Sequence, residues 1–326
     1  MPGFNARQAG DNCKKHLFSS EKSRAVNLEK YNPVFDKFFA DLAAETNADY
    51  PKLLRTDGSI DMDAGGFEFS DRDKDRQTLA DCENFFASKL GQSLDQWKVE
   101  HPKAWGVIAE KAITAVLYKV LKNDFLVART SIYDDYVNKV DDVIIDKENG
   151  SIICGLNKLD PVEGAGPDRY QEISKTISFG GAHLKYGVQL KDGKLLRRKL
   201  WSLPAFLLSV NTADLEKILP DIDRAGISAD ELRVVSGLVD SMREQLLVLY
   251  GAILTQPINF PEIMEELNRE KEELLEKYGE EEWSKTSEGR SWSRRHGQRA
   301  LAIKLKKLSV TFDKIKNILE NLKSQI

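Results

Sequence analysis

The sequence predicts an α/β protein, of the α+β type, with a mixed sheet flanked by helices and a C-terminal bundle of long helices. Two observations carry this prediction. The middle of the chain contains several short runs rich in β-branched residues, with turn signals between them, which is typical of strands. The last third repeats apolar residues in alternating steps of three and four, which is typical of helices that pack along one another.

Composition and length exclude several classes of protein. The chain has 326 residues, of which 41% are hydrophobic and 31% charged, as in an ordinary soluble protein. Its polar N-terminus lacks the apolar run of a signal peptide, and no stretch is long and apolar enough for a membrane span. Three cysteines without metal-like spacing, Cys13, Cys82 and Cys154, fit free thiols in a reducing compartment. We therefore expect a cytoplasmic protein without a membrane partner.

Three units are expected along the chain: a helical and flexible extension over 1–70, an α/β core over 71–210 and a helical bundle over 211–326. In the first unit, a helix is predicted over 33–46, with Asn32 as its cap and Val34, Phe38 and Leu42 along one face. The Asp- and Gly-rich segment 53–70 resembles a calcium loop in its spacing of carboxylates. Met62 stands where such a loop needs glycine, so we interpret the segment as an irregular loop or small hairpin.

The predicted core alternates between helical and strand-like patterns. Helices are expected over 71–90, 93–101 and 103–121. Strands are expected over 125–129, 140–146, 151–156, 182–190 and 195–201. The dipeptide Asp192-Gly193 stands between the last two strands, and this combination favours a tight β-hairpin.

The C-terminal third carries heptad-like patterns. Ser228 and Glu231 have the spacing of a capping box, which predicts a helix start. Steps of three and four then connect two sets of apolar residues: Leu232, Val235, Val239, Met242, Leu246, Leu249 and Ile253, and later Leu301, Leu305, Leu308, Phe312, Ile315, Leu319, Leu322 and Ile326. Such helices pack on each other within one chain or on a second copy, so a homo-oligomer through these heptads is one expectation.

One residue of the helix over 103–121 does not fit the amphipathic pattern. Glu110 falls at the margin of a wide apolar arc, whereas Lys111 and Lys122 mark the solvent side. A buried carboxylate is costly unless it meets a cation, a metal or a hydrogen-bond donor. Glu110 is therefore either an edge residue that reaches water or a lysine, or else a metal ligand or base.

The densest acidic cluster of the predicted core follows that helix. Asp134 and Asp135 lie in a turn-like stretch, and Asp141 and Asp142 open a run of β-branched residues. Neighbouring residues of a strand point to opposite faces, so we expect one of Asp141 and Asp142 to face a given site. Carboxylates from a strand and from an adjacent helix can hold Mg²⁺. The alternative is that Asp134 and Asp135 cap the amides of a turn.

The order of these elements resembles the PD-(D/E)xK nuclease-like superfamily, and more closely a group of uncharacterised bacterial proteins with that core. The resemblance covers the chain from Glu110 to about Pro204. Its motifs are a Tyr-Asp-Asp turn, an Asn-Gly-Val-Asp strand, an acidic strand that follows it, and a Gly-Gly-Ala…Lys-Tyr-Gly hairpin. In this sequence they stand as Tyr133-Asp134-Asp135, Asn138-Lys139-Val140-Asp141, Leu156-Asn157-Lys158, Gly180-Gly181-Ala182 and Lys185-Tyr186-Gly187.

The resemblance implies a site that uses Mg²⁺ or Mn²⁺ to cut nucleic acid. Glu110 and Asp141 would be metal ligands, with Asn157 at the place of a third, acidic ligand. Asn157 departs from the pattern, because it brings no charge to the metal and Mg²⁺ affinity should fall. Lys158 or Lys185 would supply the catalytic positive charge, and Asp160 or Glu163 could replace the missing acid.

A second candidate surface lies near the C-terminus. Arginines alternate with Trp292 and His296 in this segment, and arginine binds phosphate while an aromatic ring can stack on a base. The arginines are Arg290, Arg294, Arg295 and Arg299. The acidic segment 261–283 precedes a basic one over 284–326. This asymmetry indicates a nucleic-acid surface or two helices that neutralise each other.

Three hypotheses about function follow. The first is a Mg²⁺-dependent nuclease acting on DNA or RNA. The second is a non-catalytic relative that binds nucleic acid or protein. The third is an assembly protein in which the heptads drive oligomerisation and the acidic cluster is structural.

Overall fold

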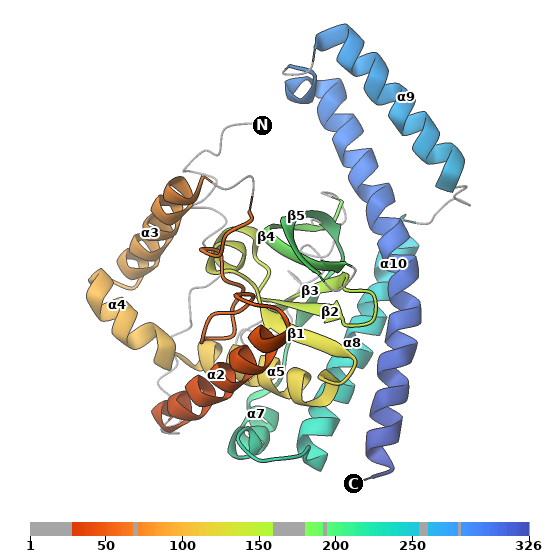
Figure 1. Cartoon of the computed structure of the whole chain (residues 1–326). Coiled ribbons are helices and arrows are strands. Elements are labelled where there is room, and N and C mark those ends of the chain that lie inside the picture. Colours follow the sequence, from red (N-terminus) through yellow and green to blue (C-terminus); the bar gives the residue numbers. More distant parts are fainter. Residues whose placement is uncertain are drawn as a thin grey trace.

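A four-stranded mixed sheet forms the centre of the protein and confirms the predicted fold class (Figure 1). The computed structural model describes residues 28–67, 71–158, 180–191, 194–253, 260–279 and 282–325. The sheet order is β1-β2-β3-β6, in which β1, β2 and β3 are antiparallel neighbours and β6 is parallel to β3. The strands are β1 (Phe125–Arg129), β2 (Asp142–Asp146), β3 (Ile152–Lys158) and β6 (Ala205–Leu208).

Burial of the strands explains why their sequences are almost continuously apolar. Nearly every residue of β1 and all residues of β2 are buried, as expected for strands that are covered on both faces. Helices pack on the sheet, and α5 (Trp105–Leu121) contacts β1 while α8 (Ala229–Ile253) contacts β6. The short strand β6 was not predicted from the sequence. It is four residues long and follows Pro204, so its pattern is too brief to be recognised.

The helices before the sheet agree with the prediction in number and place. They are α2 (Asn32–Asp49), α3 (Arg72–Lys89), α4 (Leu94–Glu100) and α5. Side-chain caps fix two of their starts: Asp71 accepts from the amide of Lys74, and Ser93 forms a capping box with Gln96.

The predicted burial of Leu42 in α2 is confirmed, but the predicted cap and the other two residues of the predicted face are wrong. Asn32 lies inside the helix, and the cap residue Tyr31 makes no side-chain cap bond. The fully buried residues are Phe35, Phe39 and Leu42, whereas Val34 and Phe38 are partly buried. The buried face is therefore rotated by about one residue from the predicted one.

A separate hairpin of β4 (Ala182–Lys191) and β5 (Lys194–Leu203) lies beside the central sheet. Lys191 pairs with Lys194, which agrees with the predicted hairpin, and the dipeptide Asp192-Gly193 lies outside the described residues. The segment 53–67 is irregular, with isolated bridges between Leu54 and Ile60 and between Ser59 and Arg129, as the loop interpretation predicts.

Four further helices complete the C-terminal part: α7 (Thr212–Ile218), α8, α9 (Phe260–Tyr278) and α10 (Ser287–Lys323). The capping box before α8 is confirmed, because Ser228 and Glu231 exchange backbone-to-side-chain hydrogen bonds of 2.8 and 3.2 Å. Helices α8 and α10 run alongside each other and bury their heptad residues, while α9 doubles back along the first half of α10 (Figure 1). The heptads thus pack within one chain.

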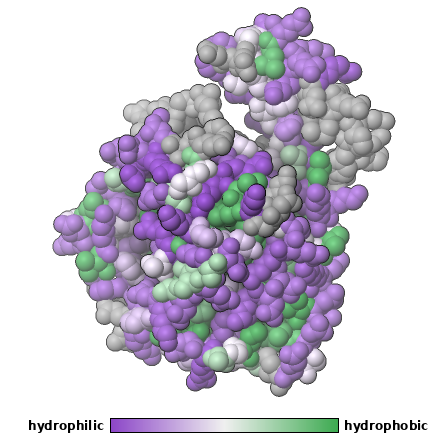
Figure 2. Space-filling model, viewed as in Figure 1, coloured by the Kyte–Doolittle hydropathy of each residue, from purple (hydrophilic) through white to green (hydrophobic). Residues whose placement is uncertain are grey.

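One hydrophobic core extends through the described residues, from Phe35 on α2 to Leu319 on α10. It crosses the boundaries expected at residues 70 and 210. A smaller cluster joins α3 to α4 through Cys82, Phe86 and Trp97. No helix in the described part of the chain combines the length and the apolar character that crossing a bilayer requires. On the face shown in Figure 2, hydrophilic residues predominate, with smaller hydrophobic patches between them.

Replacing Leu308 by alanine should lower the free energy of unfolding by about 2–5 kcal/mol, because a buried leucine leaves a cavity between α8 and α10. Urea denaturation measures this change. Val310 is 71% exposed two residues away, and Val310→Ala should alter stability by less than about 0.5 kcal/mol. Light scattering completes the test. If Leu308→Ala kept its stability but lost an oligomer, the contact between these heptad residues would lie between two copies of the chain.

Candidate functional site

Lys158 is the centre of a buried polar cluster between the sheet and α5. It is the last residue of β3, and its ammonium is buried. The Nζ atom lies 2.9 Å from Asp142 Oδ2, 2.9 Å from Thr114 Oγ1 and 3.1 Å from the backbone oxygen of Glu110. Thr114 also donates to Asp142 over 2.8 Å. One ammonium therefore ties β3 to β2 and to α5.

Asp141 reaches the same lysine from a different direction. It precedes the first residue of β2, and its Oδ2 accepts a hydrogen bond from the backbone amide of Lys158. Its own amide donates to the carbonyl of Leu156 over 2.8 Å. Because Asp141 lies before the strand, the alternation of faces does not separate it from Asp142. Both carboxylates converge on Lys158, one at the backbone and one at the ammonium.

Glu110 lies near this cluster, and its backbone oxygen accepts from Lys158. The sequence left open whether its carboxylate reaches water or a lysine, or serves as a metal ligand or base. Burial raises the pKa of Glu110 well above its ordinary value, and the charge of Asp141 raises it further. The positive charges of Lys158 and Arg129 lower the pKa of Glu110, and the negative charge of Asp135 raises it. Glu110, Asp141 and Lys158 lie close enough to interact, although they come from a helix, from a strand start and from a strand end.

A pocket of about 110 Å³ opens beside Glu110. Its lining includes the charged residues Asp57, Glu110, Arg129 and Asp135 and the aromatic residues Phe86, Trp97, His101 and Tyr136. Glu110 and Asp135 are both partly buried, and neither carboxylate makes a hydrogen bond or ion pair with another residue in the described ranges. Burial raises the pKa of Asp135, and Arg129 lowers it. Two acceptors without partners thus face one pocket.

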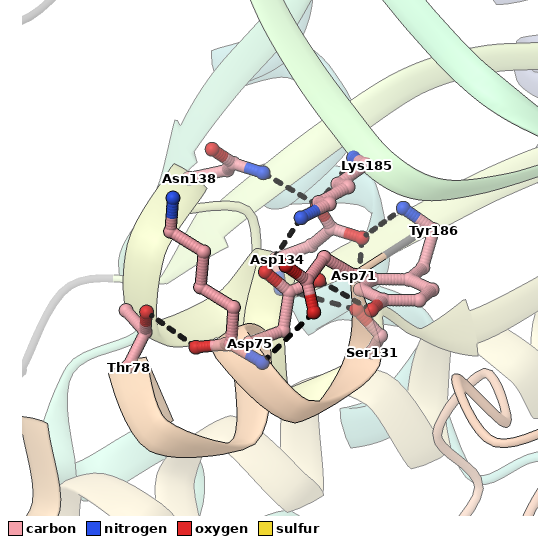
Figure 3. Close-up of polar contacts among 9 residues, drawn as sticks. Asp71, Asp75, Thr78, Ser131, Asp134, Asn138, Lys185 and Tyr186 are labelled. Carbon is pink, nitrogen blue, oxygen red and sulfur yellow. Dashed lines mark hydrogen bonds and ion pairs between the residues drawn. The ribbon is translucent and has the colours of Figure 1, made fainter. Parts of the chain in front are cut away.

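The two aspartates of the Tyr-Asp-Asp turn have different roles. This turn is η4 (Asp134–Asn138), a single π-helical turn. Asp134 is fully buried and accepts hydrogen bonds from the amides of Lys185 and Tyr186, at 2.7 and 3.0 Å, and from Ser131 and Asn138 (Figure 3). Asp134 therefore anchors the turn to β4. The structural alternative expected it to cap amides of its own turn, whereas the amides that it binds belong to β4.

Asp135 is the functional candidate that the sequence did not single out. It follows Asp134 directly, and the turn directs it to the pocket instead of the hairpin. The sequence signal was present in the paired aspartates. Nothing in the pattern separated the anchor from the pocket residue.

Lys185 takes part in a different network from Lys158. Its Nζ lies 2.5 Å from Asp75 Oδ1 on α3 (Figure 3). The same atom lies 4.8 Å from the ring centre of Tyr133. The hydroxyl of Tyr186 donates to the other oxygen of Asp75 over 2.6 Å. This network joins α3 to β4, and the structure does not bring Lys185 to Glu110 and Asp141 as it does Lys158.

Asn157 also points away from the cluster. It alternates with Lys158 along β3, and its Nδ2 donates to the backbone oxygen of Lys139 over 2.9 Å. The structure therefore does not gather Asn157 with Glu110 and Asp141. Asp160 and Glu163, which could replace the missing acid, lie outside the described residues.

The four C-terminal arginines lie on the first half of α10, beside the acidic helix α9. Arg295 forms an ion pair of 2.8 Å with Glu270 of α9, and Arg290 donates to the backbone oxygen of Lys285. Arg294 and Arg299 belong to the same helical segment. Part of the charge asymmetry is thus neutralised between neighbouring helices.

Whether these residues fit a divalent cation depends on how many ligands the protein itself must supply. No three His, Cys, Asp or Glu side chains in the described part of the chain are arranged to hold a metal ion. Mg²⁺, however, is commonly bound by one or two carboxylates together with waters and substrate phosphates. Glu110 and Asp141 supply hard oxygen donors whose negative charges oppose each other, so the donor chemistry suits Mg²⁺ or Mn²⁺ without forming a full protein cage.

Removing the charge of Lys158 should destabilise the fold strongly. Lys158→Met leaves the carboxylate of Asp142 buried without its cation, and we expect a loss of about 3–5 kcal/mol in the free energy of unfolding. The double variant Lys158→Met/Asp142→Asn should recover most of this loss. Urea denaturation of both single variants and the double variant measures the coupling free energy between Lys158 and Asp142. Losses in unfolding free energy that simply add would contradict this coupling.

Glu110 should make stability depend on pH in the absence of metal. Because its folded-state pKa is raised, folding favours the protonated carboxyl, and this contribution is lost as pH rises from 4.5 through the raised value. Glu110→Gln lacks the titration, so its stability relative to the unmodified protein should increase with pH. Urea denaturation in EDTA between pH 4 and pH 9 measures this difference in stability. If the stabilities of both proteins changed with pH in the same way, the raised pKa of Glu110 would be contradicted.

The chain matches no family model, no curated protein and no solved structure. What the protein does is therefore inferred from its own residues. The relevant features are the crowded carboxylates, the fixed lysine and the pocket beside them.

Proposed function

We propose that this protein cleaves phosphodiester bonds of nucleic acid with the help of Mg²⁺ or Mn²⁺. The proposal rests mainly on one observation: Glu110, Asp141 and Lys158 come from three separate elements and interact with one another, and Glu110 lines the pocket. Glu110 and Asp141 are metal ligands that the resemblance to the PD-(D/E)xK nuclease-like superfamily implies, and Lys158 is one of the two lysines that it implies. Asn157 and Lys185, which it also implies, are not gathered with them.

Each residue has a distinct task in this proposal. Glu110 and Asp141 hold the cation, and Asp135 adds negative charge at the edge of the pocket. When bound, the cation would lower the pKa of a water and neutralise charge on the phosphate. Lys158 is held by Asp142 and Thr114, so its ammonium is a fixed positive charge that needs no rearrangement during the reaction.

A cation also explains how an anionic substrate could approach this pocket. Asp57, Glu110 and Asp135 line it together with a single arginine, Arg129. A phosphate would be repelled by this excess of carboxylates. A divalent ion held by Glu110 and Asp141 would offset most of this negative charge and so lower the repulsion of the phosphate.

A non-catalytic nucleic-acid-binding protein is the second candidate. The observation that favours it is the engagement of Lys158, whose ammonium already has three partners, together with the orientation of Asn157 away from the cluster. In this case the buried charges stabilise the fold and take no part in chemistry. The assembly hypothesis has less support, because the heptad residues of α8 and α10 are covered within the chain.

Incubation of the purified protein with single- and double-stranded DNA and RNA tests the proposal. We expect cleavage of at least one substrate with Mg²⁺ or Mn²⁺ and none with EDTA. Asp141→Asn and Glu110→Gln should each reduce the rate at least about tenfold, since perturbing a metal site costs that much or more.

Glu148→Gln is the matched control for this experiment. Glu148 is 79% exposed, follows the far end of β2 and pairs with Lys314. Its variant should cut at the normal rate. Cleavage that survives in both Asp141→Asn and Glu110→Gln would place the active site elsewhere, and absence of any cleavage would favour the non-catalytic candidate.

A further inference from the structure

The β4–β5 hairpin and the middle of α10 form one surface, although they are far apart in the sequence (Figure 1). The ammonium of Lys304 on α10 donates to the backbone oxygen of Trp201 on β5. Just before β4, the backbone of Gly180 lies against Gly297 of α10, and a Cβ on Gly180 would come within 2.5 Å of the carbonyl carbon of Gly297. Two glycines thus allow the hairpin to lie directly on the helix.

This surface is depleted of acidic residues. Neither β4 nor β5 contains Asp or Glu, and α10 contains none between residues 289 and 312. Several of the cations nearby already have partners. Lys185 pairs with Asp75, Arg197 donates to the backbone oxygens of Pro51 and Lys52, and Arg295 pairs with Glu270.

Four residues of this surface form a patch with an aromatic centre. The basic patch consists of His183, Arg198, Trp201 and Lys304. Trp201 is 56% exposed, and its ring stacks on His183 with a centroid distance of 5.3 Å. The histidine supports one side of the indole, and the exposed remainder is available to a flat partner.

The two cations of the basic patch, Arg198 and Lys304, act on each other electrostatically. Burial lowers the pKa of Lys304 to about 8, and the nearby guanidinium of Arg198 lowers it further. No carboxylate in the described ranges raises the pKa of Lys304 against these two effects. A bound anion would relieve the repulsion between Arg198 and Lys304.

We propose that the basic patch binds single-stranded nucleic acid, with Arg198 and Lys304 at phosphates and Trp201 stacked on an unpaired base. Cations that follow a phosphate backbone and aromatic rings that receive successive bases are the general means of single-strand binding. A paired base has no free face for the indole, so a duplex would gain only the electrostatic part. This inference adds a strand-binding surface to the proposed function and rests on it for the biological substrate.

Fluorescence anisotropy with labelled oligothymidine, in EDTA and with the full chain, tests the proposal without any cleavage. Trp201→Ala should weaken binding about five- to a hundredfold by removing the stacked base, with an unchanged salt dependence. Arg198→Gln should reduce the slope of log affinity against log salt by about 0.7, which is the value for one phosphate contact of a single strand. Both residues are exposed, so circular dichroism should show intact folding.

Two variants serve as matched controls. Lys316→Gln removes an exposed cation of α10 that pairs with Glu320, and Leu247→Ala removes an apolar side chain of α8 that is 72% exposed. Both should bind like the unmodified protein. No binding at low salt, or equal binding by Trp201→Ala, would overturn the proposal. A duplex or polyglutamate that binds as tightly as oligothymidine would also overturn it.

The outcomes for the two proposals are separable. A protein that binds oligothymidine through Trp201 but cuts nothing would refute the proposed nuclease activity and leave the basic patch intact. If cleavage depends on Asp141 but Trp201→Ala binds normally, the active site stands and the basic patch is refuted. Glu110→Gln should bind oligothymidine normally in EDTA, since Glu110 lies outside the basic patch.

Discussion

The buried contact between Lys158 and Asp142 is the interaction on which the candidate site depends. An ammonium and a carboxylate that are removed from water stabilise a fold only when good geometry and further hydrogen bonds offset their desolvation. Thr114 and the backbone oxygen of Glu110 supply those further bonds. The contact fixes β3 against β2 and α5, and so it determines where Glu110 and Asp141 lie.

The charges around this contact explain why the site suits a cation. Lys158 is matched by Asp142, which leaves Glu110, Asp141 and Asp135 crowded beside Arg129. Crowded buried carboxylates either take up protons or bind a positive ion. The raised pKa of Glu110 represents the first response, and binding of Mg²⁺ or Mn²⁺ would be the second. The same arrangement therefore accounts for the pH dependence and for the proposed chemistry.

Much of the fold could be predicted because its signals are local. β-branched runs marked five strands, and the alternation of three and four marked the faces of α8 and α10. Glu110 could be singled out for the same reason, since its place on the helix follows from the helical period alone. β6 was missed because four residues carry no usable period, and the face of α2 was misjudged by about one residue.

The remaining features depend on contacts between distant parts of the chain. Asp134 and Asp135 are equivalent in the sequence, and only the position of β4 makes one an anchor and leaves the other in the pocket. Asn157 and Lys158 are neighbours on a strand, and their roles follow from which face α5 covers. The approach of Gly180 to Gly297 joins segments more than a hundred residues apart, which no local pattern reveals.

Direct titration of Mn²⁺, followed by electron paramagnetic resonance of the free ion, tests the central claim without assuming a substrate. Glu110 and Asp141 should share one cation, so the unmodified protein should bind one Mn²⁺, and Glu110→Gln and Asp141→Asn should each weaken it at least about tenfold. Glu148→Gln should bind as the unmodified protein does. Equal Mn²⁺ binding in all four proteins would contradict the claim that these two carboxylates form a cation site.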